Sequence, residues 1–289
     1  MEVLSTRAEW RAATDAARAA SHRVGFVPTM GALHLGHRSL FDAARERCDV
    51  VAASIFVNPI QFGDACDLEH YPRTLADDLA MCEAAGCDLV FTPSVTEIYP
   101  SFPELPATTI TTGGVALGYE GADRPGHFDG MATVVELLFN LTGPCTSFFG
   151  EKDFQQLCVV RQMVRDLAIQ VDVVGCPTVR EPDGLALSSR NVQLSRDGHR
   201  VALSLHRALC VGAEAAEVGR TVDEIASAMA RVVEAESGAR LFYAAVVDPL
   251  TMVVPVDADP GDEVRLLLAA EVEGVRLLDN AGAVLGPAS

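Results

Sequence analysis

Short apolar runs alternate with longer amphipathic segments through roughly the first 180 residues of the chain. This alternation is typical of β-α-β units built around a parallel sheet. The runs are almost continuously hydrophobic, as expected for strands that are buried on both faces. The predicted strands are Arg23–Val27, Val50–Val57, Asp88–Thr92, Thr146–Phe149 and Val171–Cys176. Apolar residues recur at intervals of three and four in the predicted helices, which are Ser39–Arg47, Leu75–Ala85, Ala132–Leu141 and Phe154–Ala168.

The pattern changes after Pro177, where a loop leads into two helical segments and then into strand-like runs. The loop is Arg180–Asn191, the helices are Arg196–Glu217 and Val222–Glu236, and the runs are Phe242–Asp248, Met252–Val256, Val264–Ala270 and Val275–Asp279. We therefore predict an α/β fold in two domains. Residues 1–178 are expected to form a Rossmann-like parallel sheet flanked by helices, and residues 179–289 a smaller C-terminal α+β domain.

One segment, Tyr99–Gly130, fits neither pattern. It contains four prolines and six glycines, which break any long helix or strand. It is also too long for a simple connection between two elements. We therefore predict that it forms a lid or a loop that faces a ligand.

Composition narrows the class of protein. At 289 residues and 49% hydrophobic content the chain can bury a full core, and its length favours two domains. Its net charge of −18 disfavours a nucleic acid or an anionic membrane as partner. No apolar run approaches the length of a membrane-spanning helix, and Met1–Trp10 does not resemble a signal peptide, so we expect a cytoplasmic protein. The eight cysteines are scattered without zinc-site spacing and are predicted to be buried free thiols.

Two histidines follow the first predicted strand, in the string Pro28-Thr29-Met30-Gly31-Ala32-Leu33-His34-Leu35-Gly36-His37. Residues three apart at a helix start project from one side, beside unpaired backbone N–H groups and the positive end of the helix dipole. This arrangement predicts an anion site with two imidazole donors. The helix dipole should lower the pKa of both rings, so donation by a neutral imidazole and donation by an imidazolium are both open. The alternative is an ordinary pair of surface histidines.

Lys152 is the only lysine in the chain, since arginine supplies the other 21 of the 22 basic residues. An ammonium group is a compact charge that a planar guanidinium does not replace everywhere. Lys152 lies in Gly150-Glu151-Lys152-Asp153 and is a candidate phosphate contact. The alternative is compositional drift toward arginine, and Glu151 and Asp153 have a similar alternative as ordinary acidic residues at a helix start.

Four further motifs, in the same order along the chain, resemble those of a known protein family. They are Phe56-Val57-Asn58-Pro59-Ile60-Gln61-Phe62-Gly63, Arg124-Pro125-Gly126-His127-Phe128, Gly150-Glu151-Lys152-Asp153-Phe154-Gln155-Gln156-Leu157 and Gly184-Leu185-Ala186-Leu187-Ser188-Ser189-Arg190-Asn191, with a weaker match at Tyr243–Pro249 and Leu277–Asn280. With Pro28–His37, these ordered motifs resemble the pantothenate synthetase family of the HIGH-motif adenylyl-transferring superfamily.

The resemblance implies ATP-dependent condensation of pantoate with β-alanine to give pantothenate, AMP and pyrophosphate through an enzyme-bound pantoyl adenylate. This reaction belongs to pantothenate and coenzyme A biosynthesis. The resemblance also implies ATP as a substrate, Mg²⁺ as cofactor, a homodimer, and a C-terminal domain that acts as a lid over the site. It assigns no metal ligands.

The resemblance also assigns residues. His37 matches the family's catalytic histidine, and His34, Lys152 and Arg190 are expected to act with it on the phosphates. Gln61 and Gln156 match glutamines that contact pantoate. The residues expected to bind ATP are Met30, Gly31, Ala32, Leu33, His34, Leu35, Gly36, His37, Gly150, Glu151, Lys152, Asp153, Val179, Leu187, Ser188, Ser189 and Arg190.

Several alternatives stay open. Asp153 could hold the ribose, Mg²⁺ or Lys152, and either histidine could transfer a proton. Leu187 and Leu35 stand where the family often has Met and Glu. The rival functions are a nucleotidyltransferase of the same superfamily, which would need more cations for a phosphorylated acceptor, and a nucleotide-binding regulator without turnover.

Overall fold

The computed structural model describes residues 1–63 and 65–287, and the chain divides into two compact units. The first unit consists of Met1–Glu151 and Val159–Pro177. The second unit consists of Lys152–Cys158 and the residues from Thr178 onward. The lid role that the sequence predicts for residues 179–289 stays a prediction.

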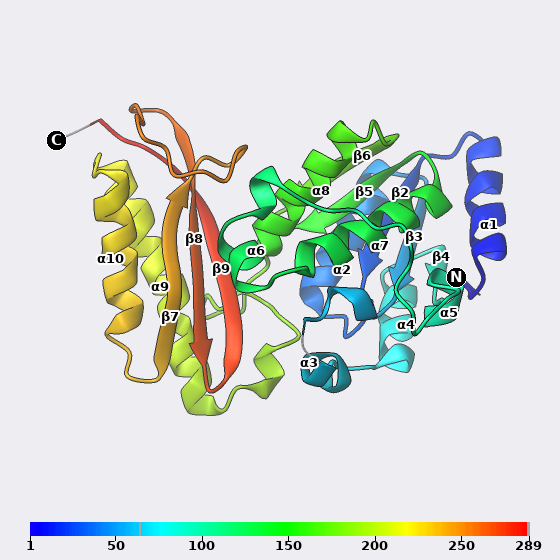
Figure 1. The fold of residues 1–289 in the computed structure, drawn as a ribbon, viewed down its shortest axis with the longest axis horizontal. Helices are drawn as coiled ribbons and strands as arrows, with labels where there is room; N and C mark the ends of the chain where they lie inside the picture. Colours follow the sequence, from blue (N-terminus) through cyan, green and yellow to red (C-terminus); the bar gives the residue numbers. More distant parts are fainter. Residues whose placement is uncertain (64, 288–289) are drawn as a thin grey trace. The chain divides into compact units, whose positions relative to one another are not determined.

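The first unit has the predicted α/β architecture. Within its described residues the strands form one six-stranded sheet in the order β1-β4-β3-β2-β5-β6, and the strand pairs are parallel (Figure 1). Its elements are β1 (Glu2–Leu4), α1 (Arg7–Ala19), β2 (Val24–Thr29), α2 (Leu35–Arg47), β3 (Val50–Ile55), the 3₁₀ turn η1 (Pro59–Gln61), α3 (Ala65–His70), α4 (Leu75–Ala84), β4 (Leu89–Phe91), α5 (Val95–Ile98), η2 (Gly114–Ala116), α6 (Tyr119–Asp123), α7 (His127–Thr142), β5 (Cys145–Gly150), η3 (Glu151–Asp153), α8 (Phe154–Asp166) and β6 (Val171–Cys176). η3 and α8 include Lys152–Cys158, which belong to the second unit.

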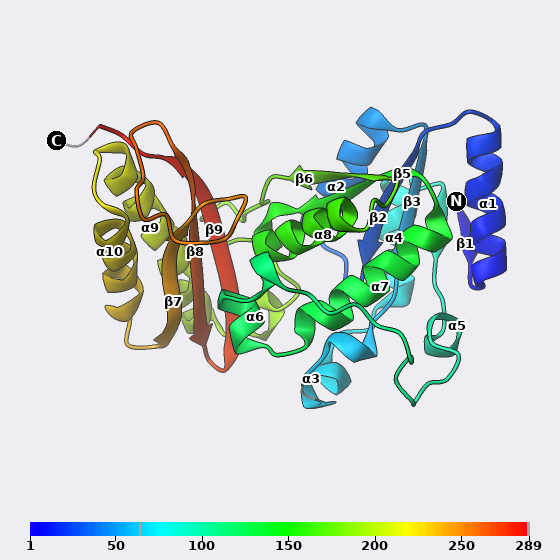
Figure 2. The ribbon, with the colours of Figure 1, turned by 45° about the horizontal axis from the view of Figure 1, so that its top comes forward.

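The strand order reverses direction between β2 and β5, which lie side by side. On one flank α1 and α7 pack against each other and against β2, whereas α2 and α4 pack against each other and against β3 (Figures 1 and 2). In such doubly wound sheets, ligands bind outside the carboxyl ends of the strands at the point of reversal. The loop that begins at Met30 leaves the carboxyl end of β2, and Gly150 ends β5 at the same edge.

The N-terminal strand and helix were not predicted. The signal was the capping box Thr6-Arg7-Ala8-Glu9, in which Thr6 Oγ1 accepts from the Glu9 N–H at 3.2 Å and Glu9 Oε2 accepts from the Thr6 N–H at 3.0 Å. Trp10 in α1 is fully buried, and its Nε1–H donates to Thr142 Oγ1 at 3.1 Å. This contact fastens α1 to the end of α7.

The segment Tyr99–Gly130 contains η2, α6 and the first residues of α7. Side chains of α7 hold its middle: Thr133 Oγ1 accepts from the Ile110 N–H at 2.9 Å, and Asp129 Oδ1 accepts from the Thr112 N–H at 2.7 Å. These contacts give the segment a defined path across its own unit. Whether it closes over a ligand stays a prediction.

The second unit has the predicted α+β architecture. Beyond η4 (Asn191–Gln193), its helices α9 (Arg196–Glu217) and α10 (Val222–Glu234) cover one face of an antiparallel sheet of β7 (Ala239–Val247), β8 (Glu263–Val272) and β9 (Val275–Val284) (Figure 1). Leu205 and Leu209 from α9, Met229 from α10, and Leu266 and Leu268 from β8 meet in its core.

One predicted strand of this unit is wrong. Met252–Val256 forms no strand, because Asp248 Oδ1 accepts from the N–H groups of Leu250 and Thr251 at 3.0 and 2.7 Å and folds the chain into a turn. Met252 then adopts a left-handed φ of +59°. The apolar character of the segment was misread as sheet character.

The prediction of buried free thiols holds with one exception. Cys48, Cys82, Cys87, Cys158 and Cys176 are free and buried, and Cys145 is half-buried. Cys210 on α9 is exposed, so the prediction is wrong there. The Cys66 side chain lies outside the described residues. Among the described helices, none combines the length and the apolar character needed to span a bilayer.

Candidate active site

Two histidines form the cap of α2. His34 is the N-cap residue, and its Nδ1 accepts from the Gly36 N–H at 3.1 Å. His37 reaches back, so that its Nδ1 accepts from the His34 N–H at 3.2 Å. The ring centroids lie 4.2 Å apart. Because both Nδ1 atoms accept hydrogen bonds, we infer that each neutral ring carries its proton on Nε2.

The loop before these histidines is held by a buried carboxylate. Asp78, on α4 and 2% exposed, accepts from the N–H groups of Ala32 and Leu33 at 3.1 and 2.8 Å. Gly31 has a φ of +84°, and a Cβ there would lie 2.8 Å from Asp78 Oδ2. The sequence predicted unpaired N–H groups at this helix start, but the protein's own side chains occupy these donors. An anion bound here would therefore depend on the imidazoles more than on the loop backbone.

Gln61 lies in a buried network at the end of β3. Its side-chain Oε1 accepts from Asn58 Nδ2 at 3.0 Å, and Asn58 Oδ1 accepts from the Tyr99 hydroxyl at 2.9 Å. Its Nε2 lies 2.9 Å from the thioether sulfur of Met30. The structure thus brings Gln61 and Met30, both predicted site residues, into contact. Burial raises the pKa of Tyr99, which keeps its hydroxyl a donor to Asn58.

The start of α7 supports this network. Arg124 donates to His127 Nε2 at 3.1 Å, so we infer that the His127 Nδ1 carries a proton and donates to the Gln61 carbonyl at 3.0 Å. A Cβ at Gly130 would lie 2.3 Å from the Ile60 carbonyl oxygen, which explains the glycine at this close helix contact. The Arg124–Phe128 motif, to which the sequence assigned no role, therefore positions Gln61.

In the second unit Lys152 lies in a basic pocket. Its Nζ is 3.3 Å from Asp153 Oδ1, so Asp153 contacts Lys152, one of the three roles left open for it. The polar residues that line the pocket are Lys152, Ser188, Arg190, Asn191, Arg276 and Asp279. Three of these six are cations. The pocket therefore has the composition expected for a phosphate group.

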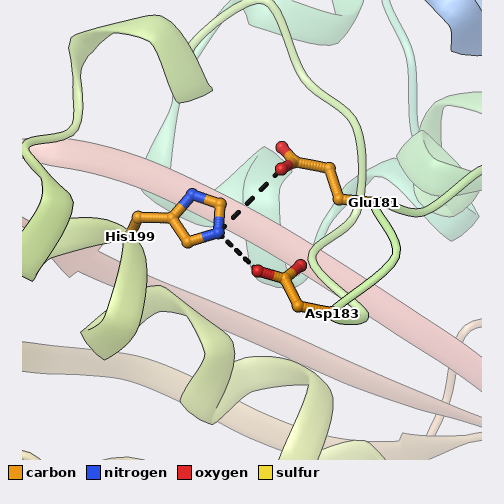
Figure 3. Close-up of side chains that lie close together, drawn as sticks. All are labelled: Glu181, Asp183 and His199. Atoms are coloured by element: carbon orange, nitrogen blue, oxygen red, sulfur yellow. Dashed lines mark hydrogen bonds and ion pairs between the residues drawn. The ribbon is translucent and has the colours of Figure 1, made fainter.

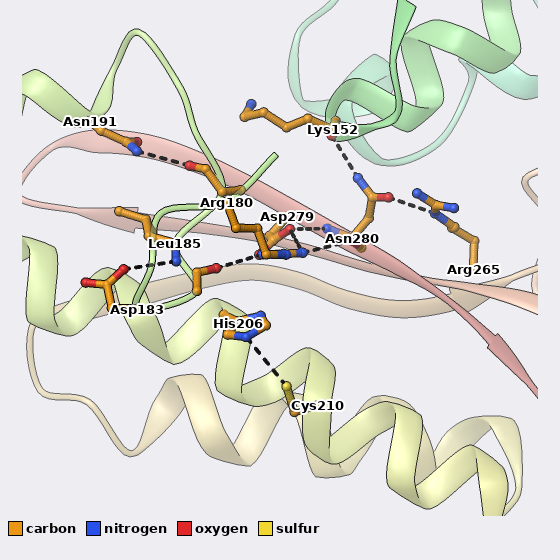
Figure 4. A network of polar contacts seen from close by, with 12 residues as sticks. Lys152, Arg180, Asp183, Leu185, Asn191, His206, Cys210, Arg265, Asp279 and Asn280 are labelled. Atoms are coloured by element: carbon orange, nitrogen blue, oxygen red, sulfur yellow. Dashed lines mark hydrogen bonds and ion pairs between the residues drawn. The ribbon is translucent and has the colours of Figure 1, made fainter. Parts of the chain in front are cut away.

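Two neighbouring residues of β9 organise this pocket (Figure 4). Asp279, 3% exposed, accepts a bidentate pair of hydrogen bonds from Arg180 at 2.7 and 2.9 Å. Asn280 Nδ2 donates to the Lys152 carbonyl at 2.8 Å, and its Oδ1 accepts from Arg265 Nε at 2.7 Å. Residues Arg180 and Ala186 pair as an antiparallel bridge, and we call the turn that they close the hairpin. Asp279 thus holds the first residue of the hairpin, and Asn280 holds the backbone at Lys152.

The hairpin brings together the remaining predicted residues of this unit. The Leu187 N–H donates to the Val179 carbonyl at 3.0 Å, and the Arg190 N–H donates to Ser188 Oγ at 3.2 Å. Asn191 Nδ2 donates to the Ala186 carbonyl at 3.0 Å and fixes the end of the turn.

The predicted residues are therefore assembled in two sets, each within its own unit. Met30–His37, Gln61, Gly150 and Glu151 belong to the first unit, and Lys152, Asp153, Gln156, Val179 and Leu187–Arg190 belong to the second. Gln156 is half-buried in the first turn of α8. Leu35, at 67% exposed, lies away from the core of its unit.

The sequence analysis did not single out four residues that hold or line the two groups of predicted site residues. Asp78 lies within a predicted helix, and nothing in the neighbouring sequence indicates that it contacts Ala32, more than forty positions earlier in the chain. Arg276 was one of many arginines. Asp279 and Asn280 had a signal, since they end the weak match Leu277–Asn280, but no role was attached to them.

A family model described as pantoate-beta-alanine ligase matches residues 2–282. The chain belongs to the pantoate–β-alanine ligase family. It is similar to the pantothenate synthetase of Salinispora arenicola, with 49% identity over 292 residues that cover 100% of this chain and 99% of the relative. Identity to the pantothenate synthetase of Chloroflexus aurantiacus is 50% over 281 residues, which cover 97% of each chain.

Solved pantoate–β-alanine ligases have the same fold. The pantothenate synthetase of Thermus thermophilus superposes with a TM-score of 0.90 at 46% identity, covering 99% of this chain and 100% of that one. A pantoate-beta-alanine ligase of Francisella tularensis, described as complexed with beta-gamma ATP and beta-alanine, superposes with a TM-score of 0.78 at 34% identity over 97% of both chains. The activity of this chain is thus ATP-dependent ligation of pantoate to β-alanine, and the rival functions fall away.

The buried ion pair at β9 generates a prediction. Asp279→Asn leaves the Arg180 guanidinium without its compensating charge, so we expect the free energy of unfolding to fall by about 3 kcal/mol. Urea denaturation followed by circular dichroism measures this loss. Asp257→Asn, at an exposed position of the same unit, is the control and should change stability by less than about 0.5 kcal/mol. Equal losses in the two variants would contradict a structural role for the pair.

Proposed function

We propose that the ligation proceeds through a pantoyl adenylate, with His34, His37, Lys152 and Arg190 stabilising the charge that develops on the phosphates of ATP. The observation that carries this proposal is the paired-histidine cap of α2. It sets two imidazoles on the loop that leaves β2, at the sheet edge where doubly wound folds bind nucleotides. Both rings are held in the tautomer that donates from Nε2.

The first step joins the pantoate carboxylate to the α-phosphorus, and the bond from that phosphorus to the leaving pyrophosphate breaks. This step needs orientation and neutralisation of charge and requires no protein nucleophile. Neutral imidazoles held by Nδ1 acceptor bonds can donate from Nε2 to phosphate oxygens without reorganising. In the second step the β-alanine amine attacks the acyl carbon and AMP leaves.

The pocket of the second unit is suited to the polyphosphate. Lys152, Arg190 and Arg276 supply positive charge, and Ser188 supplies a hydroxyl. Asp279 would repel a phosphate, but its charge is compensated by Arg180 at 2.7 Å. We therefore add Arg276 to the residues that contact ATP.

The remaining assigned ATP contacts include backbone positions. We propose that Gly150, Glu151 and Val179 contact the nucleotide through their main chain, because β5 ends at Gly150 and the hairpin pairs Val179 with Leu187. Ser189 is proposed to act with Ser188 on the phosphates.

Mg²⁺ usually binds a nucleotide through its phosphates and only one or two protein carboxylates. Asp153, whose carboxylate lies beside Lys152, fits as such a ligand. Bound there, the ion would withdraw charge from the phosphates. Lys152 would then orient the same phosphates through its ammonium group.

Gln61 is proposed to bind pantoate. Its Oε1 is engaged by Asn58, whereas its Nε2 faces a thioether sulfur at 2.9 Å, and sulfur is a weak acceptor. An oxygen of pantoate would be a stronger acceptor for the same N–H group. Gln156 is proposed to contribute a second amide from α8.

Three coarser proposals accompany the mechanism. The second unit acts as a lid that excludes water from the adenylate, the protein works in the cytoplasm, and two chains form a homodimer. All three rest on family membership and are independent of the residue roles above. A single-chain mass in light scattering would contradict the dimer.

Product analysis tests the proposed route. The chain is incubated with Mg²⁺-ATP and pantoate, with and without β-alanine, and the nucleotides are separated. We expect AMP and pyrophosphate to accumulate over many turnovers only when β-alanine is present. ADP and phosphate would indicate an acyl phosphate and would reject the adenylate route.

Lys152→Arg tests the point charge. The variant keeps the positive charge but replaces a compact ammonium by a planar group, so we expect kcat to fall by about tenfold or more. Stopped-time assays of pyrophosphate release measure the change. The control is the reverse substitution, Arg165→Lys, at an exposed position on α8. Near-normal turnover of Lys152→Arg would refute a specific role for the lysine.

Arg276→Gln tests the added phosphate contact. We expect the KM for ATP to rise by about tenfold, while the KM for β-alanine stays unchanged. The matched control is Arg240→Gln, because both guanidinium groups stack on the Phe242 ring, at 4.2 Å for Arg276 and 5.1 Å for Arg240. Of these two arginines, Arg276 lines the pocket. Equal effects of the two variants would mean that Arg276 acts through packing on Phe242.

A further inference from the structure

Three side chains of the second unit converge at a place that the ligase mechanism does not use. Glu181 and Asp183 come from the hairpin that precedes Leu187, and His199 comes from the first turn of α9 (Figure 3). His199 Nε2 lies 2.8 Å from Asp183 Oδ2 and 3.9 Å from Glu181 Oε2. The ligand atoms that the three residues offer all lie within 4.8 Å of one another.

Each carboxylate has one oxygen anchored and the other turned toward His199. Glu181 Oε1 accepts from Asn191 Nδ2 at 3.3 Å, and Asp183 Oδ1 accepts from the Leu185 N–H at 3.4 Å. The oxygens that face His199 Nε2 are the remaining two, Glu181 Oε2 and Asp183 Oδ2. Hydrogen bonds that orient the ligands from behind are the usual supporting shell of a metal site.

The backbone that carries these side chains is also fixed. The Glu181 N–H donates to the Leu185 carbonyl at 2.8 Å, and the Gly184 N–H donates to the Glu181 carbonyl at 2.9 Å. On the helix side, Ser195 caps α9 by accepting from the Gly198 N–H at 3.1 Å. The three side chains that would bind the ion therefore belong to two segments whose backbones are fixed by hydrogen bonds, which lowers the entropic cost of binding.

A simple histidine–carboxylate ion pair accounts for only part of this arrangement. The hydrogen bond from His199 lowers the pKa of Asp183, as expected for such a pair. This ion pair does not account for the position of Glu181, because its Oε2 lies 3.9 Å from His199 Nε2, which is too long for a hydrogen bond. Two ligands of a tetrahedral zinc, each about 2.1 Å from the metal, lie about 3.4 Å apart. The separations of 2.8 and 3.9 Å from His199 Nε2 lie about 0.6 Å below and about 0.5 Å above that value, and the two carboxylates lie within 4.8 Å of each other, so the three side chains would close around an ion by small side-chain adjustments.

We propose that Glu181, Asp183 and His199 bind one first-row divalent cation, with zinc as the best-fitting ion. An imidazole nitrogen with two carboxylates suits zinc, whereas Mg²⁺ and Ca²⁺ prefer oxygen ligands alone. Three protein ligands leave a fourth position for water. The bound ion ties the hairpin to α9, and that hairpin continues directly into Ser188, Ser189 and Arg190. The site is separate from the proposed Mg²⁺ contact at Asp153 and does not depend on the proposed mechanism.

Direct binding tests the proposal. The full chain is freed of metal with a chelator, kept reduced, and titrated with zinc chloride by calorimetry in the absence of nucleotide. The parent for all variants is Cys210→Ser, because the exposed Cys210 thiol lies 3.8 Å from His206 Nε2 and could bind zinc itself. We expect one zinc per chain in both the natural chain and this parent.

The variants separate the proposed site from other ligands. His199→Gln and Asp183→Asn should each weaken zinc binding by about tenfold or more, since each removes one of three ligands. His22→Gln, at an exposed histidine of the first unit, should leave the affinity unchanged. Each variant is first compared with its parent by circular dichroism, so that a loss of fold is not read as a loss of the site.

Cobalt provides a second readout that does not depend on affinity. Co²⁺ bound to the parent should give visible d–d bands without thiolate charge transfer, and His199→Gln should abolish them. The proposal is overturned if zinc does not bind stoichiometrically, if His199→Gln binds as tightly as the parent, or if Cys210→Ser alone removes the site. Displacement of zinc by an equal concentration of Mg²⁺ would also overturn the assigned class of cation.

Discussion

Two buried carboxylates, one in each unit, hold the segments that carry the proposed catalytic groups. Asp78 accepts the backbone N–H groups of the loop before His34, and Asp279 accepts the guanidinium of the hairpin that leads to Arg190. A buried carboxylate is costly unless it is fully hydrogen-bonded, so each one strongly favours the single loop conformation that satisfies it. The loops that carry the proposed catalytic groups are therefore specified by contacts within the protein itself.

The same arrangement addresses a problem of charge. A chain with a net charge of −18 has to bind triphosphate and a carboxylic acid. Two of the acidic groups are compensated within their own unit: Asp279 by the Arg180 guanidinium, and Asp78 by backbone N–H donors. The basic pocket around Lys152 can then remain attractive to phosphate within an otherwise acidic molecule.

Much of this structure could be predicted from local patterns. Apolar runs placed β3 and β6 closely, and α9 begins and ends where the 3.6-residue periodicity indicated. The motif resemblance pointed to both histidines and to the Ser188–Arg190 turn. Contacts such as Ala32 with Asp78 could not be predicted, because a single sequence carries no signal for which distant residue satisfies a loop. Met252–Val256 failed for the opposite reason, since a local side-chain turn at Asp248 overrode an apolar pattern.

The paired-histidine cap at the start of α2 depends on two ring nitrogens that accept hydrogen bonds. His34 and His37 can cap the helix only while each Nδ1 keeps its lone pair, because a doubly protonated ring has no acceptor left. Protonation of either ring would release a backbone N–H group and loosen the first turn of α2. The cap therefore does two things at once: it orders the first turn of α2, and it leaves Nε2 as the ring atom from which each neutral histidine can donate.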